Sequence, residues 1–182
     1  MRRQAKVINF GILYGMGSSA LSELTGTSRA EAKEYITQYF TAFSGIERYI
    51  ERTKAFARKH GYVETAFGRR RYVPAINSNQ FRASREAERM AVNMPIQGTA
   101  ADILKRAMIQ LSEEFHLVQS PKGSVRMLLQ VHDELVFEVR SSEVAASTPR
   151  IRKIMEHAST LAVQMKVDAR QGESWGALHA IS

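Results

Sequence analysis

Four side chains near the start of the chain have the spacing needed to contact a polyphosphate and the sugar or base attached to it. Arg2, Lys6, Phe10 and Tyr14 recur at every fourth residue. On a helix each such step drifts by about 40°, so the four form one stripe roughly 120° wide, cationic at its start and aromatic at its end. Lysine and arginine can neutralise charge on a leaving pyrophosphate. A nucleoside triphosphate therefore fits this stripe.

Spacing alone also fits, and by itself favours, an ordinary amphipathic helix whose aromatic side chains face a core. Three glycines change this balance: Gly11, Gly15 and Gly17. Each would cost roughly 1 kcal/mol in a helix interior relative to alanine, so a helix kept only for packing would rarely carry them. We expect them to allow the close approach of another backbone or of a base.

A second group with the same spacing is polar. Arg89, Asn93 and Gln97 share one helix face. A solvated surface is the simpler alternative. Asparagine and glutamine amides, however, can donate to the N3 and O2 acceptors that every base pair presents in the minor groove. Such contacts would test the shape of a base pair without reading its sequence.

A third group places carboxylates at a tight turn. His132, Asp133 and Glu134 lie between two apolar, β-branched runs within residues 125–139. The turn by itself is most simply a solvated acidic turn, because aspartate is a favoured turn residue. Mg²⁺ prefers hard oxygen ligands, and phosphoryl transfer commonly uses two such ions held by carboxylates. The turn is therefore a candidate metal site.

Composition limits the classes of protein. Lys and Arg number 26 against 18 Asp and Glu, a net charge of +8, while 44% of residues are hydrophobic, close to an average globular protein. The basic excess fits either solubility or a polyanionic partner such as nucleic acid. Cysteine is absent, and no apolar run approaches the roughly 18 residues that span a bilayer. We expect a cytoplasmic protein without a membrane partner.

Capping patterns predict where the first helices begin and end. Ser28 and Glu31 form a capping-box pattern ahead of a helix over residues 29–43. Ser44 is expected to cap a second helix, which Gly61 ends.

The remaining elements follow from periodicity and from proline and glycine. A helix is expected at the start of the chain, over residues 2–15. After Gly61 we expect, in order, a hairpin over 62–73, a helix over 81–115 that breaks near Pro95 and Gly98, a β hairpin over 125–139, a helix over 142–165 that Pro149 interrupts, and a short strand around Val167.

Three runs of sequence resemble, in order, three motifs of the family A DNA polymerases, the family typified by bacterial DNA polymerase I. They are RRQAKVINFGILYG at residues 2–15, ERMAVNMPIQGTAAD at 88–102 and LLQVHDELVF at 128–137. The resemblance continues through GESW at 172–175 to His179 and so covers nearly the whole chain.

The resemblance implies an α+β fold truncated at its N-terminus. Residues 1–80 would be a helical fingers portion, and residues 81–182 a palm portion with a small antiparallel β-sheet. It also implies a function, namely the C-terminal catalytic portion of a DNA-directed DNA polymerase. Such an enzyme adds deoxynucleotides to a primer 3′ end by two-metal phosphoryl transfer.

In the nucleotide-binding motif the resemblance implies that Arg2 and Lys6 hold the phosphates of the incoming nucleotide and that Lys6 assists catalysis. Phe10 would pack on the sugar and Tyr14 would lie near the templating base. Phenylalanine rather than tyrosine at position 10 implies discrimination against dideoxynucleotides.

The other two motifs imply contacts with DNA and metal. Asp133 would be a catalytic metal ligand, and Glu134 a neighbour with a lesser role. Residues expected to contact DNA are Arg89, Asn93, Gln97, Gln130, His132, Arg69 and Arg70. For the two hairpin arginines, Arg69 and Arg70, solvated charge is the open alternative.

The complete enzyme would use two Mg²⁺ ions, with primer–template DNA, deoxynucleoside triphosphates and an upstream polymerase portion as partners. Family members carry an earlier palm motif whose aspartate binds both metals, and residues 1–182 hold no counterpart of it. We therefore expect the chain alone to bind DNA weakly and to extend no primer. The alternatives are a non-catalytic, basic DNA-binding module that keeps the polymerase fold and a structural fragment without independent function.

Overall fold

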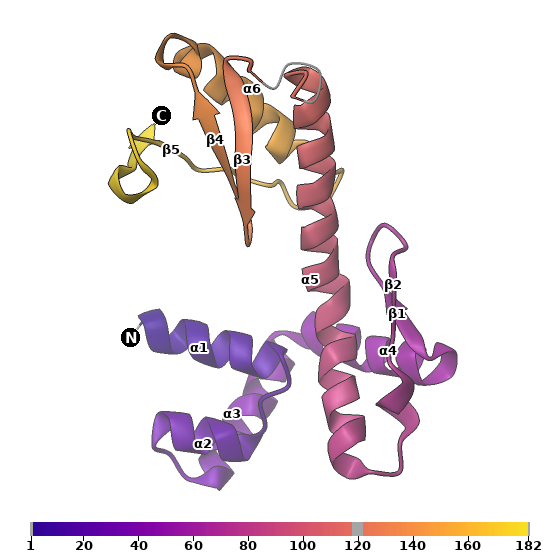
Figure 1. The fold of residues 1–182 in the computed structure, drawn as a ribbon. Helices are drawn as coiled ribbons and strands as arrows, with labels where there is room; N and C mark the ends of the chain where they lie inside the picture. Colours follow the sequence, from indigo (N-terminus) through magenta and orange to yellow (C-terminus); the bar gives the residue numbers. More distant parts are fainter. Residues whose placement is uncertain (1, 118–121, 182) are drawn as a thin grey trace. The chain divides into compact units, whose positions relative to one another are not determined.

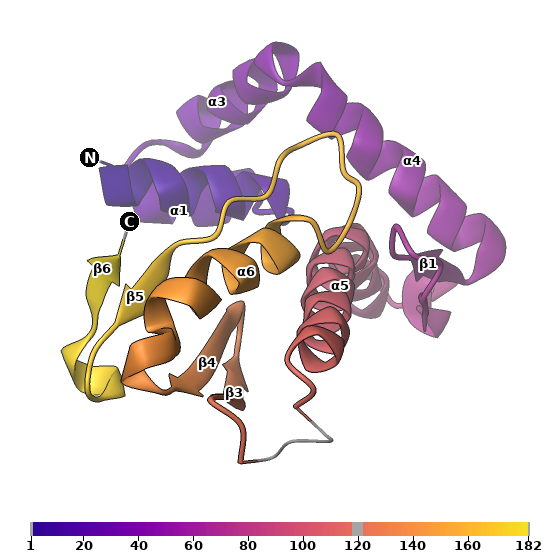
Figure 2. The same ribbon diagram turned by 90° about the horizontal axis from the view of Figure 1, so that it is seen from above.

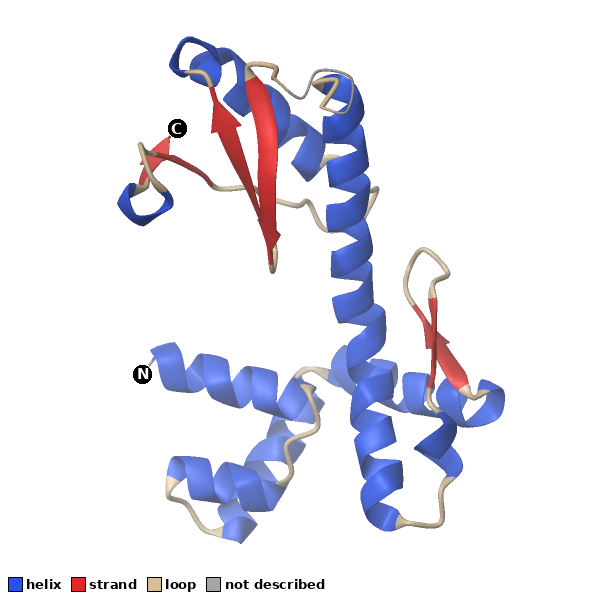
Figure 3. Cartoon of the chain, in the orientation of Figure 1, coloured by secondary structure: helices blue, strands red, loops and turns tan. Residues whose placement is uncertain are grey.

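The computed structural model describes residues 2–117 and 122–181, with side chains from residue 6 onward. The chain divides into two compact units, Met1–Thr99 and Ala100–Ser182, called here the first and second units. The regular structure of the described residues consists of helices and three two-stranded antiparallel sheets, joined by loops (Figure 3). This confirms the expected α+β class. The division into fingers and palm portions at residue 80 stays a prediction. In the ranges described, none of the helices combines the length and the apolar character needed to cross a bilayer.

The first unit is helical with one hairpin (Figure 1). Its elements are α1 (Arg2–Leu13), α2 (Ser18–Thr25), α3 (Arg29–Ala42), α4 (Ser44–His60), β1 (Tyr62–Glu64), β2 (Arg70–Tyr72), the 3₁₀ helix η1 (Pro74–Asn77) and the first part of α5 (Phe81–Glu114). The helix expected at the start of the chain and the hairpin around Gly68 are both confirmed.

Both ends of the α3–α4 pair show how local sequence sets helix boundaries. The Ser28 hydroxyl accepts from the Glu31 N–H at 3.2 Å, and the Glu31 carboxylate accepts from the Ser28 N–H at 2.8 Å. These bonds confirm the capping box, and hydrogen bonding of the Glu31 carboxylate by the side chain and then the backbone of Ser28 lowers the pKa of Glu31. Gly61 ends α4 with φ 75°, as predicted.

The predicted capping role of Ser44 is wrong. Ser44 is the first residue of α4, and Phe43 occupies the cap position without a side-chain hydrogen bond. The Phe43 ring lies 4.9 Å from the Tyr39 ring, so ring packing holds this residue at the corner where α3 and α4 meet at an angle (Figure 2). Packing, rather than a polar cap, sets this boundary.

Two apolar clusters hold the first unit together. One joins α1, α2 and α3 through buried Ile12, Leu21 and Ala32. The other joins α4, the hairpin, η1 and α5, and consists of Ala57, Val63, Val73, Ile76, Ala87, Ala91 and Met94. Each cluster removes apolar surface from water at about 25 cal/mol per Å², the main force that keeps these short elements together.

The predicted break in the 81–115 helix is wrong, because α5 runs unbroken from Phe81 to Glu114 with Pro95 inside it. Proline lacks an N–H and crowds the preceding turn, which normally breaks or kinks a helix. Here the Tyr49 hydroxyl donates to the carbonyl of Val92 at 2.8 Å, and the Thr99 hydroxyl donates to the carbonyl of Pro95 at 2.5 Å. These bonds lie on either side of the proline, but they do not replace its missing N–H, whose helical acceptor would be the Ala91 carbonyl.

Gly98 is no break either. A Cβ at this position would lie 2.7 Å from the Thr65 methyl carbon, so the absence of a side chain lets the β1–β2 hairpin pack against α5. Thr99 strengthens the same contact, since its hydroxyl accepts from the Ala66 N–H at 2.9 Å.

The second unit contains the rest of α5 and a β hairpin. Its further elements are β3 (Val125–Val131), β4 (Glu134–Val139), the 3₁₀ helix η2 (Ser141–Glu143), α6 (Val144–Glu156), β5 (Ala169–Gln171), the 3₁₀ helix η3 (Trp175–Ala177) and β6 (His179–Ile181). Ile103 and Ala107 of α5 pack against Ala158 and Met155. The predicted hairpin over 125–139 is confirmed.

Three expectations for the end of the chain need correction. The helix expected over 142–165 ends at Glu156, whose carboxylate accepts from the Val167 N–H at 3.1 Å and so holds the returning chain. Pro149 lies inside α6 rather than interrupting it. The strand expected around Val167 begins two residues later, as β5. It pairs with β6, a strand too short to be recognised in the sequence.

A Tyr49→Phe substitution is expected to lower the free energy of unfolding by about 1 kcal/mol, because the hydrogen bond that ties Tyr49 of α4 to the Val92 carbonyl of α5 is lost. Urea unfolding at neutral pH measures this loss. Tyr35→Phe, at an exposed tyrosine, is the matched control and should change little. Equal stability of the Tyr49 variant and the parent would contradict this role for the hydroxyl.

The same hydroxyl makes stability depend on alkaline pH. Burial raises the pKa of Tyr49 above its ordinary value. Because the folded chain holds this proton more tightly, the stabilisation is complete below the unfolded pKa of about 10 and is lost as pH rises toward the folded pKa. Unfolding curves across this range should show a smaller alkaline decline in Tyr49→Phe than in the parent. An identical decline would show that Tyr49 contributes none of it.

Candidate functional site

Three side chains form an ordered row along α1 and the residue that follows it, called here the α1 ladder: exposed Lys6 and Phe10, and half-buried Tyr14. The Lys6 ammonium lies 5.8 Å from the Phe10 ring centroid, and the Phe10 and Tyr14 ring centroids are 6.0 Å apart with 27° between their planes. Phe10 is 42% exposed, whereas Ile12 at another angle is 1% exposed. The amphipathic alternative required the aromatic side chains of this helix to face a core. Phe10 does not. The Arg2 side chain lies outside the described residues.

The end of α1 fixes where Tyr14 lies. The Met16 N–H donates to the Gly11 carbonyl at 2.8 Å and the Gly15 N–H donates to the Ile12 carbonyl at 3.0 Å, the two bonds of a Schellman motif. Gly15 has φ 86°, a conformation that costs residues with a Cβ about 1–2 kcal/mol. Tyr14 is thus the last residue before a glycine-dependent reversal.

The surroundings of the three glycines of this region differ from the expected close approach of another backbone or of a base. Gly15 and Gly17 follow the helix instead of lying inside it. The Met16 side chain fills the space beside Gly11, and a Cβ on Gly15 would lie 3.4 Å from the Arg89 Cγ atom. Side chains, not another backbone, are the close neighbours, and Gly17 has nothing within 4 Å of such a Cβ. The stem of Arg89 thus meets the end of α1.

The polar stripe of α5 is intact, because the helix is continuous through Pro95. Arg89 and Gln97 are exposed and Asn93 is half-buried. The Asn93 side-chain oxygen is buried and has no hydrogen-bond partner among the residues described. The structure therefore joins the first two groups found in the sequence at one point, where Arg89 packs on Gly15.

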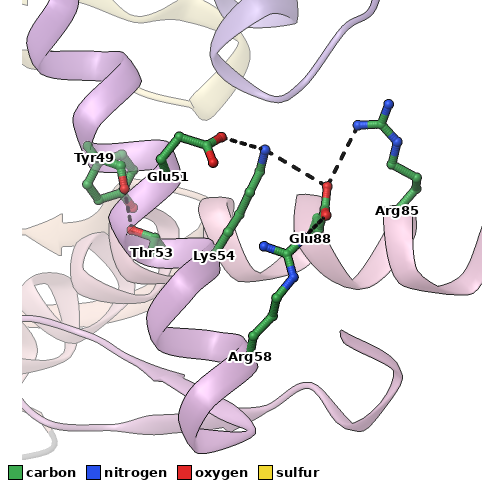
Figure 4. Close-up of polar contacts among 7 residues, drawn as sticks. All are labelled: Tyr49, Glu51, Thr53, Lys54, Arg58, Arg85 and Glu88. Atoms are coloured by element: carbon green, nitrogen blue, oxygen red, sulfur yellow. Dashed lines mark hydrogen bonds and ion pairs between the residues drawn. The ribbon is translucent and has the colours of Figure 1, made fainter. Parts of the chain in front are cut away.

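An ion cluster fixes α5 against α4 one residue before Arg89, as Figure 4 shows. Glu88, with 12% of its side chain exposed, pairs with Arg58, and it lies 3.9 Å from Lys54 and 3.7 Å from Arg85. Lys54 also pairs with Glu51 at 3.0 Å. Sequence reasoning missed this cluster, since the Glu51–Lys54 and Arg85–Glu88 spacings are visible in the sequence but the pairing of Glu88 with Lys54 and Arg58 is not.

The hairpin arginines all make contacts within the first unit. The Arg69 guanidinium donates to the Gly98 carbonyl at 3.0 Å, and Arg71 approaches the Met90 sulfur at 3.4 Å. Arg70 donates to Glu64 at 2.6 Å, a hydrogen bond that raises the pKa of Arg70. The Arg69 and Arg71 contacts tie the hairpin to α5, and the Arg70 bond joins its two strands. Backbone contacts from Arg69 and Arg70 to a DNA strand stay a prediction.

The acidic turn of the second unit is held in a strained conformation. His132 has φ 53°, which costs a residue with a Cβ of order 1–3 kcal/mol and often marks a functional segment. The Gln130 amide donates to the His132 carbonyl at 2.7 Å, and Val131 pairs with Glu134 across the strands. Asp133 and Glu134 are both exposed at this turn. A rigid hairpin thus presents two carboxylates to solvent.

The donor chemistry of this turn suits Mg²⁺, because both carboxylates supply hard oxygen ligands. Two carboxylates are an incomplete set. Across residues 2–117 and 122–181, no three His, Cys, Asp or Glu side chains converge to hold an ion. Asp133 and Glu134 would therefore need ligands beyond those described.

Comparisons with known proteins agree with one another. The family model for DNA polymerase family A matches residues 1–177. DNA polymerase I of Deinococcus radiodurans is 49% identical over 96% of this chain, and that of Pseudomonas aeruginosa is 46% identical over 98%. The chain is also similar to a solved structure, the POL domain of Pol1 from M. smegmatis in complex with DNA primer–template and dNTP. That match has 39% identity and a TM-score of 0.84, and it covers 91% of this chain and 29% of that one.

The matched relatives are much longer than this chain. The 182 residues span 18% of the Deinococcus radiodurans protein and 19% of the Pseudomonas aeruginosa protein, or about a fifth of each. The similarity thus concerns one part of those proteins.

A Gly15→Ala substitution is expected to lower the free energy of unfolding by about 1–2 kcal/mol, since alanine resists the left-handed conformation. Gly45→Ala is the matched control, because a Cβ there meets only an Arg48 nitrogen at 4.0 Å. It should be neutral or stabilising by up to about 1 kcal/mol. Chemical unfolding of both variants measures the difference. Equal effects would show that the reversal after Tyr14 does not require glycine.

A Glu88→Gln substitution is expected to lower the free energy of unfolding by about 1–3 kcal/mol, because it weakens hydrogen bonds to charged partners and leaves three cations close together. Glu86→Gln removes the same charge from an exposed neighbour on α5 and serves as the control. Thermal unfolding of the two variants should separate them. Indistinguishable melting temperatures would mean that the cluster contributes nothing.

Proposed function

The chain belongs to DNA polymerase family A, and from this membership we propose that it is the nucleotide-binding and catalytic portion of a DNA-directed DNA polymerase. The observation that carries the proposal is the α1 ladder. A cation and two rings stand in one row, in which Lys6 and Phe10 are exposed and Tyr14 is half-buried, and Arg89 of the polar stripe packs at its end. A triphosphate with its sugar and base needs that order of groups along one rigid surface.

The α1 ladder assigns one task to each side chain. Lys6, with Arg2 one turn earlier, would hold the phosphates and neutralise charge on the pyrophosphate as it leaves. Phe10 would pack on the sugar, and Tyr14 would lie near the templating base. The reversal at Gly15 gives Tyr14 a fixed position, which supports this last role.

The duplex would be read without regard to its sequence. Arg89, Asn93 and Gln97 can donate to minor-groove acceptors that all base pairs share. Arg69 and Arg70 would contact a strand backbone. In the second unit, Gln130 and His132 would lie beside the primer terminus. The bond from the Gln130 amide to the His132 carbonyl supports a rigid arrangement there.

The reaction joins the primer 3′ oxygen to the α-phosphorus of the nucleotide and breaks the bond to pyrophosphate. Asp133 and Glu134 would hold divalent metal. When bound, two Mg²⁺ ions would make the 3′-hydroxyl a better nucleophile and screen the charge of the triphosphate. We place this function in the cytoplasm, where DNA and deoxynucleotides meet in bacteria.

A second candidate is a non-catalytic DNA-binding module. It is favoured by basic charge alone, since residues 52–72 hold seven Lys and Arg against one Glu. Such a module would show salt-sensitive DNA affinity and would have no use for a triphosphate site. Nucleotide binding therefore separates the two candidates.

Lys6→Ala is expected to weaken Mg²⁺-dependent binding of dATP by about tenfold or more, because a charge-assisted contact to phosphate is worth about 1.5–3 kcal/mol. Calorimetric titration with and without Mg²⁺ measures this. Lys33→Ala, at an exposed lysine of α3, removes the same charge elsewhere and should leave binding unchanged. A parent chain without Mg²⁺-dependent dATP binding would favour the DNA-binding module, and equal dATP affinity in the Lys6 variant and the parent would contradict the role given to Lys6.

The 182 residues alone are expected to extend no primer, because Asp133 and Glu134 lack a further converging ligand among the described residues. A primer-extension assay with Mg²⁺ and all four deoxynucleotides tests this. Robust synthesis that disappears in Asp133→Asn would contradict the expectation and show that this chain completes its own metal site.

A further inference from the structure

The β1–β2 hairpin has an inner and an outer face. Strand alternation turns Val63 inward, where it is 1% exposed in the apolar cluster with α5. Tyr62 pairs with Tyr72 across the strands, and Glu64 pairs with Arg70. These four side chains therefore share the opposite side of the two-stranded sheet, called here the outer face.

Aromatic rings cluster on and beside the outer face. The Tyr62 and Tyr72 centroids are 5.8 Å apart, and Phe56 and His60 of α4 lie 5.6 and 6.0 Å from Tyr62. The Arg70 guanidinium covers the Tyr62 ring at 4.4 Å. Tyr72 remains 69% exposed and Phe56 37% exposed. Rings and a cation thus form one accessible patch.

The surrounding segment is strongly basic. Residues 52–72 hold seven Lys and Arg and a single acid, a net charge of +6, against +8 for the whole chain. That acid, Glu64, is already paired with Arg70. Two of the seven cations, Lys54 and Arg58, pair with Glu51 and Glu88 outside this segment, so the charge that attracts an approaching anion is smaller than +6 but remains positive.

Exposed rings amid cations match the chemistry of a single strand of nucleic acid. Unpaired bases can stack on aromatic side chains while the phosphates are attracted by the basic surroundings. A blunt duplex hides the faces of its bases and offers the rings nothing to stack on. An acidic peptide would use the charge and leave the rings without a role.

We propose that the outer face is a stacking platform for single-stranded DNA, with Tyr72 as its most accessible ring. The proposal rests on the proposed function, because a polymerase copies a template strand that is unpaired ahead of the primer. Its alternative is that the tyrosine pair only stabilises a short hairpin.

The test uses the full chain and two fluorescent probes, a short oligothymidine and a blunt hairpin duplex. Tyr72→Leu should weaken oligothymidine binding by about tenfold, since one stacked base contributes about 1–3 kcal/mol. The salt dependence of binding should stay the same, because no charge changes. Binding of the duplex should also stay the same. Tyr72→Phe keeps the ring and should bind as the parent does.

Trp175→Leu is the matched control. Trp175 is 52% exposed in the second unit, beside Glu173, and its loss should leave oligothymidine affinity unchanged. Oligothymidine affinity in Tyr72→Leu equal to that of the parent would overturn the platform. So would a parent chain that fails to bind oligothymidine, or a Trp175 variant that loses as much affinity as Tyr72→Leu.

Photo-cross-linking of the parent chain to a bromodeoxyuridine oligonucleotide gives an answer even if Tyr72→Leu fails to fold. Adducts on the peptide with Tyr62 or Tyr72 are expected, and adducts confined to other segments would overturn the platform.

The failure of the stacking platform can be distinguished from the failure of the proposed nucleotide site. If dATP binding requires Lys6 but oligothymidine binding ignores Tyr72, only the platform is wrong. If Tyr72 matters and no Mg²⁺-dependent dATP binding exists, the nucleotide site is wrong.

Discussion

The left-handed conformation of Gly15 determines how the first unit presents its candidate nucleotide site. It closes α1 directly after Tyr14 through two backbone hydrogen bonds, and it leaves room for the stem of Arg89. The α1 ladder and the polar stripe of α5 meet at this point. A residue with a Cβ would strain the reversal, so this glycine fixes the point at which the α1 ladder meets the stem of Arg89.

Contacts that hold α5 to α4 and to the hairpin maintain this arrangement. Glu88 of α5 lies near three cations, two from α4 and one from α5. The Tyr49 hydroxyl donates a hydrogen bond to the carbonyl of Val92 near Pro95. Gly98 lets Thr65 approach the helix. Together they keep α5 straight enough for Arg89, Asn93 and Gln97 to remain on one continuous helix despite the proline.

Local patterns in the sequence predicted the features that depend on interactions between residues close in sequence. The four-residue spacing of Lys6, Phe10 and Tyr14 predicted the ladder, and Ser28 with Glu31 predicted the capping box. The hydrogen bond from Tyr49 to α5 near Pro95 could not be predicted, because Tyr49 lies 43 residues from the carbonyl it contacts. The contact of Arg89 with Gly15 and the cluster around Glu88 likewise join residues distant in sequence. The family resemblance was confirmed by the comparisons, whereas the roles of individual site residues stay predictions.

The most direct test of the nucleotide site is a map of which backbone amides respond when dATP and Mg²⁺ are added to isotopically labelled chain. NMR shift changes should be concentrated in residues 6–16, along the α1 ladder and its Gly15 reversal. Changes confined to other segments, with those of α1 unmoved at saturating nucleotide, would contradict this expectation.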